Sequence, residues 1–350
     1  GPAAEAPATL VPTSSLRPEL PKTEGTSGET EMTTEALPPA NTVDHEARNR
    51  AIGVGLAALG AALFSLKGVV IKLAFAEGIG VSQLLTLRMA FSLPVYLAVG
   101  IFAYMRLKKQ PSLKTYALAA GLGIMSYCLS SWLNFEGLKY VSAQLERLIL
   151  YIYPTMVAGL SFFFLKDKIT TRHVIALILA YVGVAVLFGA EISHQGANAW
   201  LGGGLIFAGA LIYAVYVTAS KPIISRMGST LFTAFGMSAA SIVFLTQSGI
   251  DMAFHSPPPV TANGYWLALV LAIFCTVIPS FMIAEAIGRI GPGRMSAIGG
   301  VGPVVAAWAA VMILHEPFGW PHIVSMALTI AGVWLLAKPK ITRTAGARTW

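Results

Sequence analysis

Charged side chains interrupt otherwise apolar segments in the first half of the chain. These residues are Lys67, Lys72, Arg88, Glu146 and Arg147. A charge at membrane depth costs at least about 2.5–3.5 kcal/mol on insertion scales, so each is expected to have a partner, water or a ligand. Four bases against one acid leave a positive excess, unless Glu77 and Glu136 near the segment ends contribute. That excess can attract an anionic group such as a carboxylate or a phosphate.

The depth of each base decides whether its charge can reach water. Lysine and arginine near a helix end extend to the membrane interface, which is the expected position of Lys72. For Arg88, this position and an inward one both remain open. Lys67 lies about sixteen residues into its segment, which is too deep for its ammonium group to reach the interface. We therefore expect Lys67 to face a cavity.

Glu146 and Arg147 lie in the segment 141–165, which also contains Pro154. Adjacent helical residues point about 100° apart, so these two do not pair with each other. We expect Glu146 to contact a base on a neighbouring helix and Arg147 to face a ligand. A purely structural ion pair between helices is the alternative. Pro154 frees the carbonyl of Leu150 and predicts a kink.

Polar and aromatic side chains recur at helical spacing in two further segments. One stripe, at i, i+3, i+4 and i+7, consists of Tyr127, Ser130, Ser131 and Asn134, with Trp132 nearby. The other, at i, i+3 and i+7, consists of Tyr213, Tyr216 and Ser220. A polar stripe on a transmembrane helix either bonds to other helices or lines water, and both interpretations remain open.

These features define the predicted binding site. The candidates for substrate binding are Lys67, Ser131, Trp132, Asn134, Glu146, Arg147, Tyr151, Tyr213 and Tyr216. Glu146 and Glu285 are candidates for proton coupling, although Arg289 follows Glu285 at i+4 and favours a surface ion pair. The GGVGP motif at 299–303 prevents a stiff helix and lets a substrate or another backbone come close.

No motif indicates a catalytic residue, a metal site or a cofactor. The GRIGPGR run at 288–294 lacks the GK[ST] ending of a phosphate loop, and the spacing of His315, Glu316 and His322 does not fit a zinc site. Cys128 and Cys275 both fall in apolar spans, where a buried, unpaired cysteine is expected. An enzyme is therefore not expected.

The composition places these residues in an all-α integral membrane protein. Of 350 residues, 55% are hydrophobic and only 11% are charged, against roughly 25% charged in soluble domains. The net charge of +8 could suggest nucleic acid, but the bases lie in short loops between apolar spans. Membrane topology explains them better, so the lipid bilayer is an expected partner and nucleic acid is not.

Ten apolar spans are predicted between two tails. They are 51–75, 81–105, 115–135, 141–165, 173–190, 200–220, 230–250, 264–287, 294–314 and 320–337. Residues 1–50, rich in Pro, Thr, Glu and Ser, are expected to be disordered, and 339–350 form a basic tail. Seventeen Lys and Arg lie on one set of loops and termini and only Lys139 on the other. This bias predicts both termini in the cytoplasm, with the chain in a plasma (bacterial inner) membrane.

A displacement of 149 residues aligns the two halves without a gap. Matching pairs are Glu136 with Glu285, Pro154 with Pro303, Asp167 with Glu316 and His173 with His322. Each copy, 51–190 and 200–338, has five spans, so the copies insert with opposite orientation around a central cavity. Such inverted repeats are typical of transporters, because equivalent halves can open alternately to either side. Glu146 and Arg147 correspond to Met295 and Ser296, so the charge is not duplicated.

The ten spans, the inverted five-helix duplication and the proline in each fourth span resemble EamA-type transporters of the drug/metabolite transporter superfamily. In that family an acidic residue and a polar turn follow each fourth helix, as LKDKIT (165–170) and LHEPFG (314–319) do here. The resemblance covers about 51–337. It implies a secondary transporter of small metabolites.

The predicted function is transport, with export the expected direction, of a small-molecule substrate by alternating access. The substrate would be amino-acid-like, an organic anion or drug-like, and protons are a candidate coupling ion. Two alternatives remain: a membrane enzyme acting on a lipid-linked substrate through Glu146 or Glu285, and a non-transporting sensor or assembly subunit. The pattern leaves the oligomeric state open.

Overall fold

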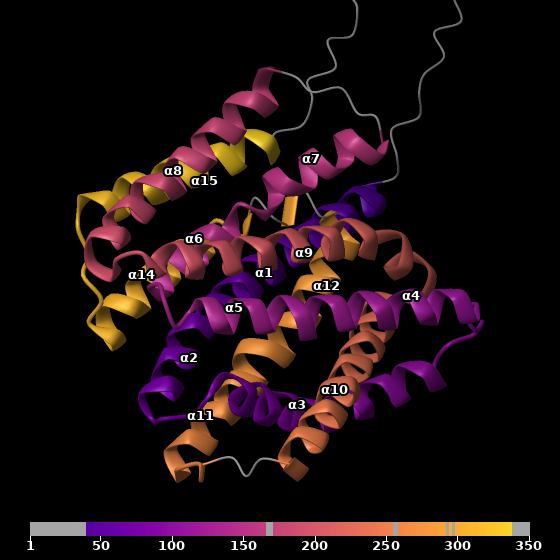
Figure 1. Ribbon diagram of the computed structural model, residues 1–350. Coiled ribbons are helices and arrows are strands. Elements are labelled where there is room, and N and C mark those ends of the chain that lie inside the picture. Colours follow the sequence, from indigo (N-terminus) through magenta and orange to yellow (C-terminus); the bar gives the residue numbers. More distant parts are fainter. Residues whose placement is uncertain (1–39, 166–170, 255–257, 292–293, 296–297, 338–350) are drawn as a thin grey trace, which may run out of the picture. The chain divides into compact units, whose positions relative to one another are not determined.

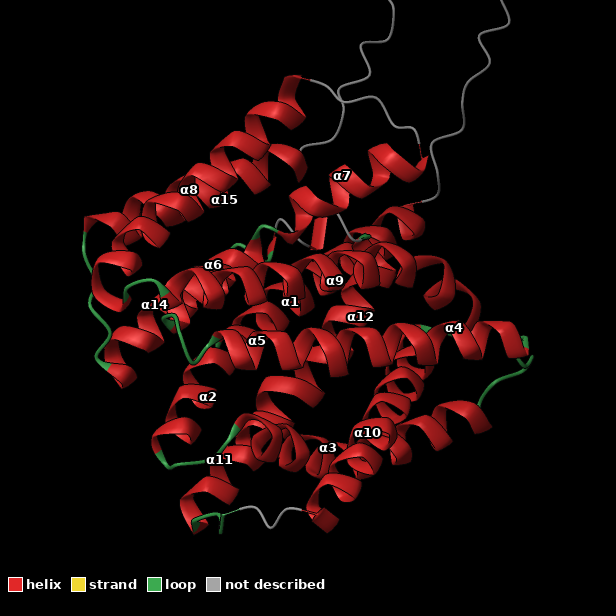
Figure 2. Cartoon of the chain, viewed as in Figure 1, coloured by secondary structure: helices red, strands yellow, loops and turns green. Residues whose placement is uncertain are grey.

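The computed structural model describes residues 40–165, 171–254, 258–291, 294–295 and 298–337. These residues form helices and loops, and no strand occurs among them (Figure 2). The arrangement below is that of the compact unit Asp44–Trp350. Residues 1–39 of the first predicted tail and all of the tail 339–350 lie outside the described residues, whereas residues 40–50, predicted to be disordered, are helical.

The first half of the chain contains eight α-helices and one π-helical segment within the described residues. They are α1 (Ala40–Ser65), α2 (Lys67–Ala76), α3 (Val81–Met105), α4 (Leu113–Gly123), the π-helix Ile124–Ser130, α5 (Ser131–Gly137), α6 (Ala143–Tyr151), α7 (Tyr153–Leu165) and α8 (Thr171–Gln195). The second half contains α9 (Asn198–Met227), α10 (Ser229–Phe254), α11 (Ala262–Ala272), the π-helix Ile273–Val277, α12 (Ile278–Ile290), α14 (Val301–Leu314) and α15 (Trp320–Ala337) (Figure 1).

Within the described residues, six helical stretches are long and apolar enough to cross a membrane. They are Arg48–Ala76, Val81–Met105, Leu113–Gly137, Asn198–Met227, Ser229–Asp251 and Ala262–Ile290. Shorter apolar helices cover Val174–Ala190, Val301–Leu314 and Trp320–Leu335. The remaining predicted span, 141–165, is divided between α6 and α7. The predicted start of the ninth span falls partly outside the described residues.

The span 141–165 is two helices rather than one kinked helix. Proline has no N–H and its ring clashes with the carbonyl four residues before it, so a helix continuing through Pro154 would be strained. The chain instead breaks at Ile152, and Pro154 occupies the first turn of α7, where the missing donor costs nothing. Thr155 stabilises the break, because its N–H and its hydroxyl both donate to the carbonyl of Ile152, at 2.9 and 2.7 Å.

The internal repeat is visible in the element boundaries. Both ends of α4 and α11 differ by 149 residues, and the π-helices that follow begin at Ile124 and Ile273, again 149 apart. A shared helix boundary can be coincidental, but a rare π-helical segment at equivalent positions is not expected by chance. The predicted two-repeat architecture is therefore confirmed.

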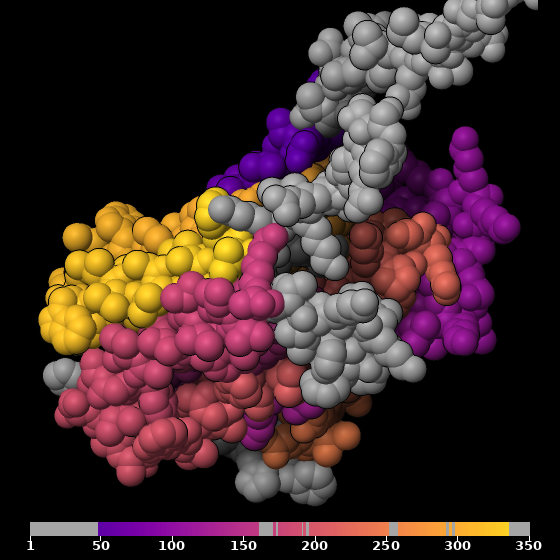
Figure 3. Space-filling view, turned by 90° about the horizontal axis from the view of Figure 1, so that it is seen from above, coloured from indigo at the N-terminus to yellow at the C-terminus, as the bar shows by residue number. Residues whose placement is uncertain are grey.

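Equivalent helices of the two repeats pack against each other and run antiparallel. In α3 and α10, Thr86 bonds to Ser248 at 2.9 Å and Met89 to Ser241 at 3.4 Å, so partner numbers fall as residue numbers rise. In α8 and α15, the Thr329 hydroxyl donates to the carbonyl of Ala180, its own repeat equivalent, at 3.4 Å. Figure 3 shows α15 in yellow lying along α8 in magenta. Antiparallel pairing of equivalent helices is the geometry that inverted repeats produce.

Candidate binding cavity

A cavity lies between the two repeats. Polar, charged and aromatic side chains dominate its wall. They are Phe64, Lys67, Arg88, Ser126, Tyr127, Ser130, Ser131, Asn134, Arg147, Tyr151, Tyr153 and Tyr213. The second repeat contributes Tyr213, Ile283, Met295 and Gly299. All charged wall residues among the described ones come from the first repeat, so the cavity is asymmetric although the scaffold is duplicated.

Lys67 and Glu146 form a buried ion pair between α2 and α6. Lys67 Nζ lies 3.2 Å from Glu146 Oε1, and the two side chains are 5% and 1% exposed. Lys67 is the first residue of α2, directly after a break in the helical run at Leu66. Glu146 thus contacts a base on a neighbouring helix, the arrangement expected from the sequence. Removing both ions from water is costly, so the pair depends on the close contact.

Arg147 points from α6 toward the second repeat. Its Nη2 donates to the carbonyl of Ala61 at 3.4 Å, and its guanidinium lies 5.8 Å from the centre of the Phe64 ring. A β-carbon at Gly302 would lie 2.6 Å from Arg147 Nη2 and 2.8 Å from Nε, which is closer than real β-carbons approach. The GGVGP motif therefore makes room for this guanidinium. The group that comes close to Gly302 is thus the Arg147 side chain, whereas a substrate or another backbone was expected there.

Arg88 takes the inward of its two expected positions. It is 2% exposed on α3, donates to the carbonyl of Tyr127 at 3.3 Å, and lies over the Phe135 ring with its guanidinium carbon 5.1 Å from the ring centre. Arg88 was not among the predicted binding residues. Its charge within an apolar segment indicated a special role. The position of Arg88 along the helix could not show whether the side chain is buried in the protein or extends to the membrane interface.

Tyrosine rings form one continuous part of the wall. Tyr153 meets Tyr213 edge to face at 5.2 Å between ring centres, and Tyr213 stacks on Tyr216 at 5.8 Å. Tyr216 in turn meets Tyr127 edge to face at 5.8 Å. Tyr216 is buried behind the wall and supports Tyr213 and Tyr127, rather than lining the cavity as predicted. Tyr151 lines the cavity as expected, and Tyr127 and Tyr153 are additions.

The stripe on the third span lines the cavity through the π-helix. A π-helical turn widens the helix and changes which side chains face inward, and such turns occur frequently at functional sites. Ser126 and Ser130 come from this segment, and Ser131 and Asn134 from α5. Ser130 also donates to the carbonyl of Gly209 at 2.9 Å. The stripe therefore lines the cavity and bonds to a neighbouring helix at once.

Glu146 and Tyr216 adjoin the wall without lining it, and two further predicted site residues lie elsewhere. Trp132 is 41% exposed on the outside of α5, since it is one residue from Ser131 and so faces away from the Ser131–Asn134 side. Glu285 lies on α12 outside the cavity wall, in an ion pair with Arg289 at 2.8 Å, and also accepts from Ser229. The assignment of Trp132 to the cavity is thus corrected, and Glu285 has the surface pairing that its spacing favoured.

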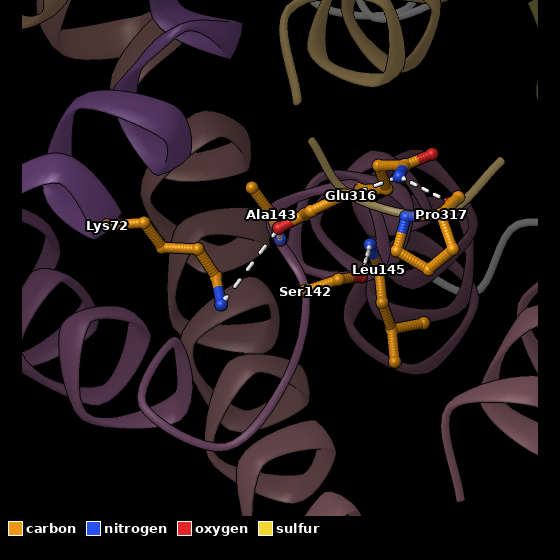
Figure 4. A network of polar contacts seen from close by, with 7 residues as sticks. Lys72, Ser142, Ala143, Leu145, Glu316 and Pro317 are labelled. Carbon is orange, nitrogen blue, oxygen red and sulfur yellow. Dashed lines mark hydrogen bonds and ion pairs between the residues drawn. The ribbon is translucent and has the colours of Figure 1, made fainter. Parts of the chain in front are cut away.

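A second polar network joins the repeats at the start of α6. Glu316 Oε1 accepts from the backbone N–H of Ala143 at 3.0 Å, and Glu316 Oε2 accepts from Gln144 Nε2 at 3.3 Å. Lys72 Nζ lies 4.0 Å from the same carboxylate, as Figure 4 shows. The Ser142 side chain caps the helix by accepting from Leu145 N–H. The acidic residue after the fourth helix of one repeat therefore fixes the charged helix of the other.

Among the described residues, no group of three or more His, Cys, Asp or Glu side chains is placed to hold a metal ion. The cavity instead offers guanidinium and ammonium groups, hydroxyls, an amide and aromatic faces. This set can bind a small organic molecule by ion pairing, hydrogen bonding and ring contact.

An all-helical membrane protein with two inverted repeats around a polar cavity has the architecture of a secondary transporter. The chain belongs to the EamA-like transporter family, whose model matches residues 51–189 and 200–338. It is 30% identical to the uncharacterized transporter YcbK of Bacillus subtilis over 79% of this chain and 90% of the relative. It is 25% identical to a probable terminal-alkyne amino-acid exporter of Streptantibioticus cattleyicolor, over 78% of this chain and 89% of that protein.

A crystal structure with 18% sequence identity superposes with a TM-score of 0.60, over 84% of this chain and 99% of the other. At this identity the likeness concerns the fold alone. The family and the names of these relatives indicate a membrane transporter rather than an enzyme.

Proposed function

We propose that the chain is a secondary transporter that exports a small metabolite by alternating access. The substrate would be amino-acid-like, an organic anion or drug-like. The observation that carries the proposal is the cavity between inverted repeats. Its charged and aromatic wall can hold a solute while the repeats move against each other and open the cavity to one side of the membrane or the other. The name of the Streptantibioticus relative, an amino-acid exporter, supports a small metabolite and the outward direction.

The proposed topology has both termini in the cytoplasm of a bacterial inner membrane. The bias of Lys and Arg supports this orientation. The Arg289 side chain at the end of α12 also bonds to Asn49, which lies between Arg48 and Arg50 in α1, so basic residues of two helices lie at the same end. The opposite end contains the Glu77 carboxylate, which accepts from Thr261 and Asn263 at 2.9 and 2.7 Å. Two fusions to the C-terminus test this orientation: a phosphatase that is active only in the periplasm, and a fluorescent protein that is fluorescent only in the cytoplasm. The proposed orientation predicts fluorescence and no phosphatase activity.

We assign the proton-coupling role to Glu146 rather than to Glu285. Glu146 adjoins the cavity through its contact with Lys67, whereas Glu285 is bound to Arg289 outside the wall. A proton on Glu146 would weaken the Lys67 contact and so change the charge that a substrate meets. The binding of a proton and the binding of a charged substrate would then be coupled through the charge of the cavity.

Counterflow in proteoliposomes tests the proposal directly. Vesicles with purified protein are loaded with a mixture of amino acids, organic acids and amphiphilic cations, and entry of labelled traces is followed. Uptake above that of empty vesicles is expected for at least one class. A pH gradient should drive accumulation by the unchanged protein but not by Glu146→Gln. Uptake equal to empty vesicles for every class contradicts the transport proposal.

A further inference from the structure

The charges around the cavity do not balance. Lys67, Arg88 and Arg147 are three bases and Glu146 is one acid, so the formal excess is two positive charges. Glu146 adjoins the cavity through Lys67, and no acid is among the described residues that line it. Glu146 is paired with Lys67, which leaves the two arginines as the source of the excess. A buried charge without a counter-charge is costly, and a bound anion would relieve that cost.

The two arginines also hold unused hydrogen-bond donors. Each guanidinium has five N–H donors, yet the bonds found are single ones, to Ala61 from Arg147 and to Tyr127 from Arg88, at 3.4 and 3.3 Å. The Nε atoms of both arginines are buried and have no hydrogen-bond partner among the described residues. Both side chains are at least nine-tenths buried and border the same cavity.

A carboxylate suits these donors. Guanidinium presents parallel N–H groups that match the two oxygens of a carboxylate, and such charge-assisted bonds are about twice as strong as neutral ones. One part of the wall is aromatic and apolar, with Tyr153 and Tyr213 in edge-to-face contact and Ile283 and Met295 nearby. An apolar or aromatic body would lie there.

An ammonium group on the same ligand would have no counter-charge. Glu146 lies 3.2 Å from Lys67 behind the wall, and no acid is among the described residues that line the cavity. The buried amide oxygen of Asn134 has no partner among the described residues and can accept a hydrogen bond, but it carries no charge. A zwitterion has no net charge, so it would leave the excess of two positive charges unchanged. Its ammonium group would also be repelled by the bases of the cavity.

Resting on the transport function proposed above, we propose that the cavity selects organic carboxylates without an ammonium group, with Arg88 and Arg147 binding the carboxylate. The preference distinguishes this site from one that takes zwitterionic amino acids. Arg88 and Arg147 are then specificity-determining residues, and the tyrosine wall takes the apolar body of the same ligand.

Three probes with one phenyl body isolate the charge: 3-phenylpropionate, phenylalanine and 2-phenylethylamine. Isothermal titration calorimetry on the purified full-length protein in nanodiscs should give the tightest binding for the anion. Phenylalanine should bind at least about tenfold more weakly, and the amine more weakly still. Equal or tighter binding of the zwitterion or the amine overturns the inference. So does binding of none of the three at millimolar concentration.

Variants locate the effect within the protein. Arg88→Gln and Arg147→Gln should each weaken 3-phenylpropionate binding about tenfold, and Arg147→Lys should lose less because it keeps the charge but not the paired donors. Arg106→Gln is the matched control, since Arg106 is exposed at the end of α3 and lies over the Phe102 ring. If an arginine variant aggregates, the ranking of the three probes on the unchanged protein still decides.

Counterflow separates this inference from the transport proposal. Binding of 3-phenylpropionate with no exchange in proteoliposomes contradicts transport and leaves the anion site standing. Exchange of phenylalanine or 2-phenylethylamine in preference to 3-phenylpropionate contradicts the anion site and leaves transport standing.

Discussion

The guanidinium of Arg147, from the first repeat, occupies the space that a side chain at Gly302, in the second repeat, would fill. A β-carbon at Gly302 would lie 2.6 Å from Arg147 Nη2 and 2.7 Å from the Ser65 hydroxyl. The repeat equivalent of Gly302 is Tyr153, which has a large side chain and itself lines the cavity. The duplicated scaffold therefore diverged at this position, and the divergence made room for the unduplicated arginine.

Gly302→Ala should displace Arg147 and weaken ligand binding without removing a charge. Because the added methyl would overlap the guanidinium, the Arg147 side chain or α14 must shift. We expect about tenfold weaker binding of 3-phenylpropionate, measured by calorimetry. Gly204→Ala is the control, since nothing lies within 4 Å of a β-carbon there. Equal affinity in both variants would show that the Gly302 contact does not position Arg147.

Glu146→Gln should destabilise the protein more than Lys67→Gln. Removing one partner of a buried pair costs roughly 3–5 kcal/mol. Without Glu146, Lys67 stays buried near Arg88 and Arg147, whereas without Lys67, Glu146 still has Arg147 as a nearby cation. Thermal unfolding in nanodiscs gives the order, and the double variant should recover part of the loss. Losses that add, or the reverse order, would contradict this account of the pair.

Glu316→Gln should weaken the junction between the repeats. The carboxylate accepts from Ala143 N–H and Gln144 and lies near Lys72, so the amide loses charge at the start of α6. We expect a loss of about 1 kcal/mol in unfolding free energy, the usual size for a helix cap. Glu136→Gln, which breaks only the partly exposed pair with Lys139, should change stability by less. The two are compared by thermal unfolding.

Tyr213→Ala should reduce affinity for a ligand with an aromatic body, whereas Trp132→Ala should not. Tyr213 contacts Tyr153 and Tyr216, and aromatic pairs contribute about 0.5–1.5 kcal/mol each beyond area burial. Trp132 faces outward from α5. Calorimetry with 3-phenylpropionate should show about a tenfold loss for the first variant. A comparable loss for Trp132→Ala would contradict the orientation of α5.

The amino-acid sequence by itself determined the class, the repeat and the charged helix. Long apolar runs and matched residues 149 apart depend only on composition and order, and the boundaries of α4 and α11 agree with that register. A deep Lys67 and an embedded Glu146 also predict a polar interior, because a charge in lipid is too costly to leave unpartnered. Local chemistry determined that Pro154 would disturb its helix.

Only the tertiary structure decided which of these side chains meet. Arg88 could have reached the interface, and its burial over Phe135 depends on the packing of α3 against α5, which helix periodicity does not specify. Trp132 and Asn134 share one short helix, and the rotation of α5 that turns one outward and the other inward is set by its neighbours. The Gly302–Arg147 and Glu316–Ala143 contacts join residues more than 150 positions apart, a relationship that spacing along one chain cannot encode.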